Sequence, residues 1–163
     1  MHLQLMPQLI GQKVTDVLAF EGNIYKLKVV SNILKAKKNR SGETVRSIRV
    51  DTQNQDLIVW GRENFHNMET GISPQEMKAS ISTLSYLSVR SNIAAWSKYL
   101  PLEFVNVKER FMFASNVVRN IGEKGSLLFQ QGGRKDIYSN EEEALLKNIS
   151  DKVGQIIVNT QIL

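Results

Sequence analysis

The chain contains no cysteine, which excludes disulfide bonds, thiol nucleophiles and every zinc site built on cysteine ligands. Histidine is scarce as well, because only His2 and His66 occur and neither belongs to a His-x-x-His or His-Glu-x-x-His pattern. A metal centre or a catalytic triad needs several such groups at defined spacing. The sequence therefore predicts no metal site, no cofactor and no catalytic residue, and we interpret His66 as an ordinary loop residue.

Long apolar runs are also lacking. No run approaches the roughly 18 residues that a membrane-spanning helix needs, and the opening MHLQLMPQLIG has no basic start of the kind that secretory signals carry. We expect a soluble intracellular protein, cytoplasmic or nucleoid-associated, without membrane contact. The 163 residues are 42% hydrophobic and 23% charged, which is close to globular averages and predicts a packed core.

Charge is unevenly distributed along the chain. The net charge is +5, and residues 34–50, LKAKKNRSGETVRSIRV, account for all of it because they hold six basic residues and only one acidic residue, Glu43. The six basic residues are Lys35, Lys37, Lys38, Arg40, Arg46 and Arg49. Such a segment is a candidate for neutralising phosphate groups, although a solvated turn is the simpler interpretation.

Residues 12–62 show the patterns of β-strands. IYKLKVV (24–30) alternates between apolar and polar positions, as a half-buried strand does. LIVW (57–60) is continuously apolar, which is typical of a strand covered on both faces. Turn signals at EGN (21–23) and NRSGE (39–43) separate the β-prone runs, so the pattern predicts an antiparallel meander with a basic hairpin around NRSG.

Helical periodicity begins after residue 72. SPQE (73–76) has the form of a capping box with proline at the first helical position. Asn106 and Glu109 form a second cap-like pair, and Gly122 is a stop signal for that helix. We expect four helices, which begin at Ser73, at Ser91 or Asn92, at Asn106, and at Ser139 or Asn140. The tail IIVNTQIL fits either a continuation of the last helix or a strand.

A second hairpin is predicted at residues 126–139, where a Gly-Gly pair separates two short β-prone runs. The expected fold is therefore α+β. An N-terminal antiparallel β-meander or small barrel would occupy residues 1–65, a helical region with a small β-hairpin would occupy residues 66–163, and the two would pack as one compact unit.

The order of three helices, a hairpin and a further helix resembles the winged helix-turn-helix family over residues 73–155. In that family the third helix enters the major groove and the hairpin wing touches the backbone. The resemblance implies contacts from the exposed side of the third helix and from the wing tip, at Lys108, Ser115, Asn116, Arg119, Asn120, Arg134 and Lys135. Glu109 and Glu123 oppose such contacts, and a helical layer packed on the sheet is the simpler alternative.

These patterns favour a non-enzymatic protein that binds nucleic acid through phosphate contacts. The residues expected to bind are Lys35, Lys37, Lys38, Arg40, Arg46, Arg49, Arg119, Arg134 and Lys135. Tyr25, Trp60 and Phe65 lie close by in sequence and are candidates for stacking on single-stranded bases. The patterns do not distinguish DNA from RNA.

Two other classes of function remain open. The apolar helix stripes could build a homo-oligomer, in which the basic segment meets nucleic acid or an acidic partner surface within the assembly. A metal-dependent nuclease is the remaining alternative, and it depends on the carboxylates of Asp51, Asp56 and Glu63.

Overall fold

The computed structural model describes residues 5–36, 41–62 and 65–161, and it describes side chains within these ranges from residue 10 to residue 160. The chain is 72% helical, and the described residues contain one two-stranded antiparallel sheet. The expected N-terminal meander or barrel is therefore wrong, and the fold is mostly helical rather than α+β. The chain divides into two compact units, of which one joins residues 1–65 to residues 135–163 and the other comprises residues 66–134.

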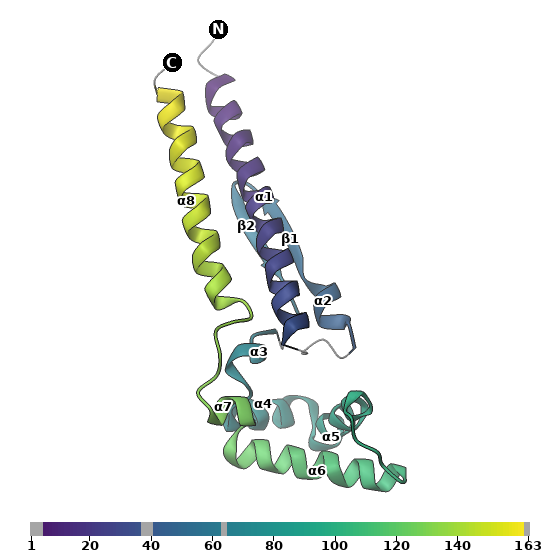
Figure 1. Cartoon of the computed structure of the whole chain (residues 1–163). Helices are drawn as coiled ribbons and strands as arrows, with labels where there is room; N and C mark the ends of the chain where they lie inside the picture. The colour runs from purple at the N-terminus through teal and green to yellow at the C-terminus, as the bar shows by residue number, and fades with distance from the viewer. Residues whose placement is uncertain (1–4, 37–40, 63–64, 162–163) are drawn as a thin grey trace. The chain divides into compact units, whose positions relative to one another are not determined.

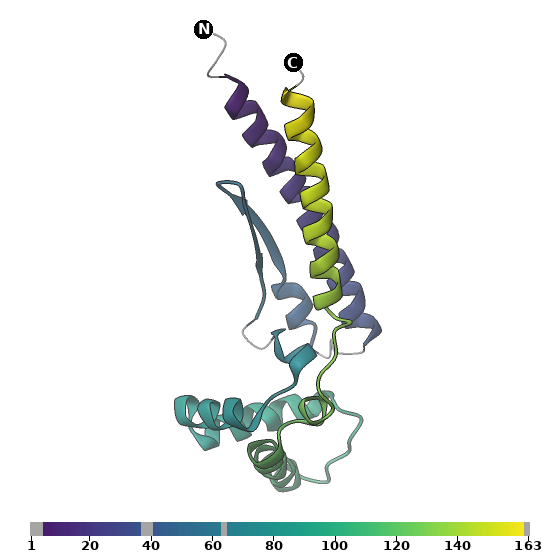
Figure 2. The same ribbon diagram turned by 90° about the vertical axis from the view of Figure 1, so that its left-hand side faces the viewer.

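The first unit is built on two long helices, α1 (Leu5–Lys35) and α8 (Ser139–Gln161). The helices lie side by side and run in opposite directions, so the start of α1 and the end of α8 share one end of the unit (Figure 1, Figure 2). The C-terminal run whose state the sequence left open continues α8 as helix through Gln161.

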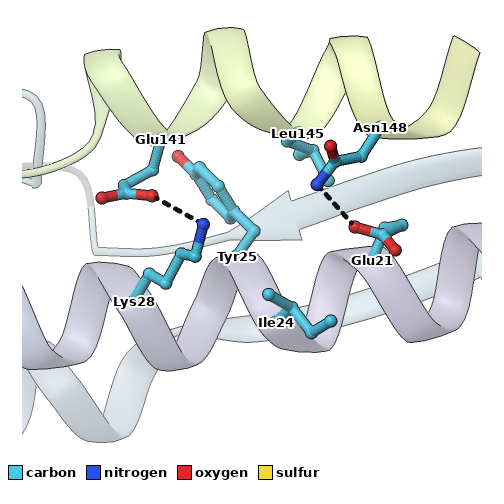
Figure 3. Close-up of a pocket in the computed structure, with 7 residues that line it drawn as sticks. All are labelled: Glu21, Ile24, Tyr25, Lys28, Glu141, Leu145 and Asn148. Carbon is cyan, nitrogen blue, oxygen red and sulfur yellow. Dashed lines mark hydrogen bonds and ion pairs between the residues drawn. The ribbon is translucent and has the colours of Figure 1, made fainter. Parts of the chain in front are cut away.

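Ion pairs cross the seam between α1 and α8 at two levels. Lys152 Nζ lies 2.5 Å from Glu21 Oε1, and Lys28 Nζ lies 3.3 Å from Glu141 Oε2. The side-chain amide of Asn148 donates to the other oxygen of Glu21 at 3.2 Å (Figure 3). Residue numbers rise along α1 as they fall along α8, so the contacts fix an antiparallel register. A shifted register leaves buried polar groups without partners, which is costly.

The strands predicted for residues 12–30 are helical because α1 is covered on two faces. The buried residues Leu18, Tyr25, Val29 and Ile33 recur at helical spacing, whereas Leu27 is 68% exposed. Helix α8 packs on one face of α1 and the β-hairpin packs on another. Apolar residues therefore surround α1, and the single apolar stripe that identifies a surface helix is missing from the sequence.

Gly22 lies inside α1 and not in the turn that EGN suggested. A Cβ atom at this position would lie 2.6 Å from Leu57 Cδ1 and 2.8 Å from Val50 Cγ1 of the hairpin. Glycine is required here because the hairpin approaches the helix backbone more closely than any side chain permits. A turn signal in the sequence is thus a packing contact in the structure.

The hairpin follows a short helix, α2 (Glu43–Ser47), and consists of β1 (Arg49–Gln53) and β2 (Asp56–Trp60). Asn54 and Gln55 form its turn with φ values of 51° and 67°, the left-handed conformation that a two-residue type I′ turn requires. The hairpin predicted around NRSG is therefore wrong in position, and the real turn lies further along the chain.

The strand predicted at LIVW is confirmed as β2, but its predicted burial is wrong. Ile58 is 37% exposed and Trp60 is 51% exposed. A two-stranded sheet that packs on one helix has only one covered face, so the other face stays open to solvent.

The second unit, residues 66–134, is a small helical bundle. Its elements are α3 (Asn67–Thr70), α4 (Pro74–Leu84), α5 (Tyr86–Trp96), the 3-10 helix η2 (Ser97–Tyr99), α6 (Val107–Lys124) and α7 (Leu127–Gln130). Helices α4, α5 and α6 each contribute one side chain to the buried centre, namely Met77, Val89 and Val118. Half-buried isoleucines surround this centre at positions 72, 81, 93 and 121.

The helix-start signals of this unit are largely confirmed. Ser73 and Glu76 form the predicted capping box, with the Ser73 side chain accepting from the Glu76 N–H at 3.1 Å. Asn106 accepts from the Glu109 N–H at 2.9 Å and begins α6. The predicted start of the second helix is wrong, because Ser85 caps α5 six residues earlier.

The hairpin predicted at residues 126–139 is also wrong, so the winged-helix order is not present. Ser126 accepts from the Phe129 N–H and starts α7. Gly132 and Gly133 have φ values of 81° and 79°, and the Gly133 N–H donates to the Leu128 carbonyl at 2.9 Å. The glycine pair ends a short helix, which is a use of left-handed glycine as common as a β-turn.

Candidate nucleic-acid interface

The basic segment 34–50 is not a β-arm. Lys35 is the last residue of α1, Arg46 lies in α2, and Arg49 begins β1. Lys37, Lys38 and Arg40 lie outside the described residues. The described parts of the segment are thus the end of α1, the short helix α2 and the start of β1.

The two faces of the hairpin differ in what they meet. The register pairs Val50 with Val59 and Thr52 with Leu57, and Val50 and Leu57 contact α1 at Gly22. Side chains alternate between the faces of a strand, so the remaining pairs lie on the outer face. These outer pairs are Arg49 with Trp60, Asp51 with Ile58, and Gln53 with Asp56.

The open end of the hairpin, opposite its turn, gathers three arginines. Arg49 is exposed at the start of β1, and Arg46 is exposed three residues earlier, in α2. Arg62 follows β2, donates its backbone N–H to Ser47 Oγ at 3.2 Å and forms an ion pair with Glu43. We call Arg46, Arg49 and Arg62 together the basic end of the hairpin.

Arg46 is held by the turn that precedes its helix. Its guanidinium Nη2 donates to the Ser41 carbonyl at 3.2 Å and lies over Gly42, which has a φ of 76°. Arg46 and Arg49 form no ion pair with any carboxylate of the described residues. Both arginine side chains are exposed.

Lys35 lies at the same end of the unit as these arginines. The turn of the hairpin reaches the start of α1, where Gln55 lies 3.2 Å from a Cβ built on Gly11, and the middle of the hairpin meets Gly22. The open end of the hairpin therefore points toward the C-terminal end of α1, where Lys35 is exposed (Figure 1).

The rest of the outer face is acidic. Asp51 lies opposite Ile58 and Asp56 lies opposite Gln53. Gln53 Nε2 donates to Asp51 Oδ2 at 3.2 Å. Since these carboxylates repel phosphate, an anionic ligand is expected at the open end and not along the whole hairpin.

The structure separates the three aromatic residues proposed for base stacking. Tyr25 is 8% exposed in the α1–α8 seam. Phe65 is half-buried, and its ring centroid lies 5.1 Å from that of Tyr138. Trp60 alone of the three is substantially exposed, and it lies directly across the sheet from Arg49.

Helix α6 (Val107–Lys124) carries exposed side chains of both charges. Lys108 and Arg119 are exposed on it, but so are Glu109 and Glu123. Asn116 and Asn120, which were also expected to contact nucleic acid, are exposed. Ser115 is half-buried, and its hydroxyl donates to the Phe111 carbonyl. Helix α6 carries four basic and two acidic residues, so its acidic residues offset only part of its positive charge.

The remaining two predicted residues do not lie on a wing. Arg134 is half-buried, and its backbone N–H donates to the Glu69 carbonyl at 2.8 Å. Lys135 is exposed, and its carbonyl accepts from the Asn140 N–H at 3.2 Å near the start of α8. Arg134 and Lys135 belong to different units. Of the nine predicted residues, Arg46 and Arg49 lie at the open end of the hairpin, together with Arg62. The sequence patterns did not indicate Arg62, although it lies two residues after LIVW.

Within residues 5–36, 41–62 and 65–161, no three His, Asp or Glu side chains gather closely enough to hold a metal ion. A hollow of about 10 Å³ between α1 and α8, lined by Glu21, Lys28 and Glu141, has room for about one water molecule (Figure 3). It is too small for a substrate.

No protein-family model, no curated protein and no solved structure matches this chain. In the part of the chain that the structure describes, no helix is both long enough and apolar enough to cross a bilayer.

Proposed function

We propose that this protein binds nucleic acid without catalysing a reaction on it, and that the basic end of the hairpin is the contact surface. The observation that carries the proposal is the pair Arg46 and Arg49, two exposed guanidinium groups without a carboxylate partner among the described residues. Guanidinium groups match phosphate geometry well, and phosphate contacts supply most of the affinity of non-specific binding.

Neighbouring charges support the same surface. Lys35 ends α1 on this side of the unit, and the sequence places Lys37, Lys38 and Arg40 in the connection that follows. These residues extend the proposed contact beyond the hairpin. Positive charge gathered at one end of a unit attracts a polyanion and raises the rate of encounter.

A titration of labelled oligonucleotides at several salt concentrations tests the proposal. Binding is expected at low salt, with log K falling linearly against log salt. Arg46→Gln with Arg49→Gln is expected to flatten the slope by about 1.4 on a single strand, at roughly 0.7 per phosphate contact. Lys98→Gln with Lys124→Gln, two exposed lysines of the other unit, changes net charge equally and serves as the matched control. Absence of binding at low salt would contradict the proposal.

A second candidate function is self-assembly, which an exposed stripe on α1 favours. Phe20, Leu27 and Leu34 recur every seven residues and are 59%, 68% and 53% exposed. Seven-residue spacing keeps side chains on one helix face, as in coiled coils. Light scattering on the wild type and on Leu27→Lys tests this candidate, because a dimer formed through the stripe is expected to dissociate in the variant.

A further inference from the structure

We infer that Trp60 is a stacking platform for an unpaired base, so that the nucleic acid bound at the basic end of the hairpin is single-stranded. This inference rests on the proposed function and narrows its substrate class. It starts from the 51% exposure of Trp60, which leaves much of its indole ring accessible to a ligand.

Strand pairing holds the backbone of Trp60 in the hairpin. Trp60 ends β2 and pairs with Arg49 in the register of the sheet. The opposite face of the hairpin packs on α1 through Val50 and Leu57. The indole therefore projects from the outer face on a strand that is anchored to a long helix, and a preformed platform loses little entropy on binding.

The charges around Trp60 suit the backbone of a nucleic acid strand. Arg49 lies directly across from it in the sheet, and Arg46 lies three residues before Arg49, in α2. Arg62 follows two residues after Trp60 and is paired with Glu43. An exposed aromatic ring with flanking cations is the arrangement by which proteins bind single strands, with the base on the ring and the phosphates on the cations.

The alternatives fit these residues less well. In a duplex both faces of each base are already stacked, so a flat indole at the surface gains nothing from a closed double strand. The charge of the outer face also changes along the hairpin. It is positive at Arg49 and negative at Asp51, two residues further on, where phosphate is repelled. A strand is therefore expected to cross the open end of the hairpin and not to run along it toward the turn.

Tryptophan fluorescence provides the test, because the chain has only two tryptophans. Trp96→Phe removes the other one, which is 46% exposed on α5 in the other unit, and leaves Trp60 as the reporter. In this background an unlabelled oligo-dT 20-mer is expected to quench the emission of Trp60. A blunt duplex hairpin of equal phosphate number is expected to bind at least tenfold more weakly and to quench less.

Affinity measurements on two substitutions separate stacking from charge. Trp60→Ala is expected to weaken single-strand binding by about 5- to 100-fold, with duplex binding nearly unchanged. Trp60→Phe retains an aromatic face and is expected to recover most of the affinity. Circular dichroism and urea unfolding confirm that the hairpin variants are folded.

The outcomes distinguish the inference from the function on which it rests. Equal binding of single strand and duplex, with Trp60→Ala as tight as the parent, overturns stacking and leaves phosphate binding intact. No binding of either nucleic acid at low salt overturns both. Poly-glutamate that binds as tightly as the oligonucleotide and is insensitive to Trp60→Ala identifies an acidic protein partner and overturns the single-strand assignment.

Discussion

Glu21 of α1 and Lys152 of α8 form an ion pair in which the carboxylate is buried and the ammonium group is half exposed. Their atoms Oε1 and Nζ lie 2.5 Å apart, and the two residues are separated by 131 positions in the sequence. The hydrogen bond from Lys152 lowers the pKa of Glu21 below its ordinary value, although burial opposes this shift. Asn148 and Lys28 act in the same direction as Lys152.

This pair predicts a pH dependence of stability. Because the pKa of Glu21 is lower in the folded state than in the unfolded state, its contribution is present above about pH 4.5 and disappears as the pH falls through the folded value. Glu21→Gln is expected to lower the free energy of unfolding at pH 7 by roughly 1 to 2 kcal/mol. The difference from wild type is expected to shrink below pH 4.5 in urea unfolding.

The control for this prediction is Asp151→Asn, which removes an exposed carboxylate one residue from Lys152. It is expected to leave the pH profile close to that of the wild type. A difference between wild type and Glu21→Gln that stays constant from pH 7 to pH 3 contradicts the assignment.

Two helical glycines predict opposite effects of the same substitution. Gly154→Ala in α8 places a methyl group where no atom lies within 4 Å, so helix propensity alone is expected to stabilise the protein by up to about 1 kcal/mol. Gly22→Ala gains the same propensity but meets Val50 and Leu57, and overpacking costs roughly 1 to 3 kcal/mol. Thermal or urea unfolding of the two variants checks the signs. Equal stabilisation by both would show that the hairpin does not pack on Gly22.

Removal of the capping box of α4 is expected to lower the stability of that helix. Ser73 accepts from the Glu76 N–H, and Glu76 Oε2 accepts from the Ser73 N–H at 2.7 Å, which lowers the pKa of Glu76. Ser73→Ala is expected to cost about 1 kcal/mol. Ser82→Ala, an exposed position within the same helix, is expected to be neutral or slightly stabilising. Hydrogen exchange of α4 amides measures the difference, and equal protection in both variants is the contrary result.

Replacement of the basic residues that follow α1 in the sequence is expected to change the salt dependence of oligonucleotide binding. If Lys37, Lys38 and Arg40 all touch phosphate, replacing the three with Gln flattens the single-strand salt slope by about 2. The triple replacement of Lys78, Lys98 and Lys108, which are exposed in the other unit, is the control of equal charge. If both triples flatten the slope equally, net charge and not this connection governs binding.

Removal of the negative charge of Asp51 is expected to increase the affinity for oligonucleotides. Its carboxylate lies on the outer face of the hairpin, two residues from Arg49, and opposes phosphate at that position. Asp51→Asn is expected to tighten oligonucleotide binding by about 2- to 5-fold at low salt, within the range of exposed charge effects. Asp16→Asn, an exposed acid on α1, is the matched control. Unchanged affinity in Asp51→Asn would place the contact away from the outer face.

Local signals in the sequence predicted the second unit better than the first. The caps at Ser73 and Asn106 act through hydrogen bonds between residues three positions apart, so their patterns can be read directly. The character of α1 depends on partners more than 100 residues away, as in the bond from Asn32 to Glu141. The sequence around Gly22 has the pattern of a turn, and only the hairpin that packs on this glycine explains its place in a helix.

The candidate site was only partly predictable for the same reason. The charge of residues 34–50 is visible in the sequence, but the grouping of Arg46 and Arg49 with Arg62 depends on strand pairing. The exposure of Trp60 was not visible at all, because an apolar run such as LIVW suggests burial on both faces. Only the helix under one face of the hairpin shows which side of the strand faces solvent.

The division of the first unit along the chain affects how it can fold. Its long helices lie at opposite ends of the sequence, and residues 66–134 form a separate compact unit between them. Contacts across such separations close large loops, which slows folding. If the inserted unit folds first, it shortens the effective loop between β2 and α8. During synthesis α1 and the hairpin then emerge long before α8, and the side of α1 that α8 covers stays exposed until α8 has been made.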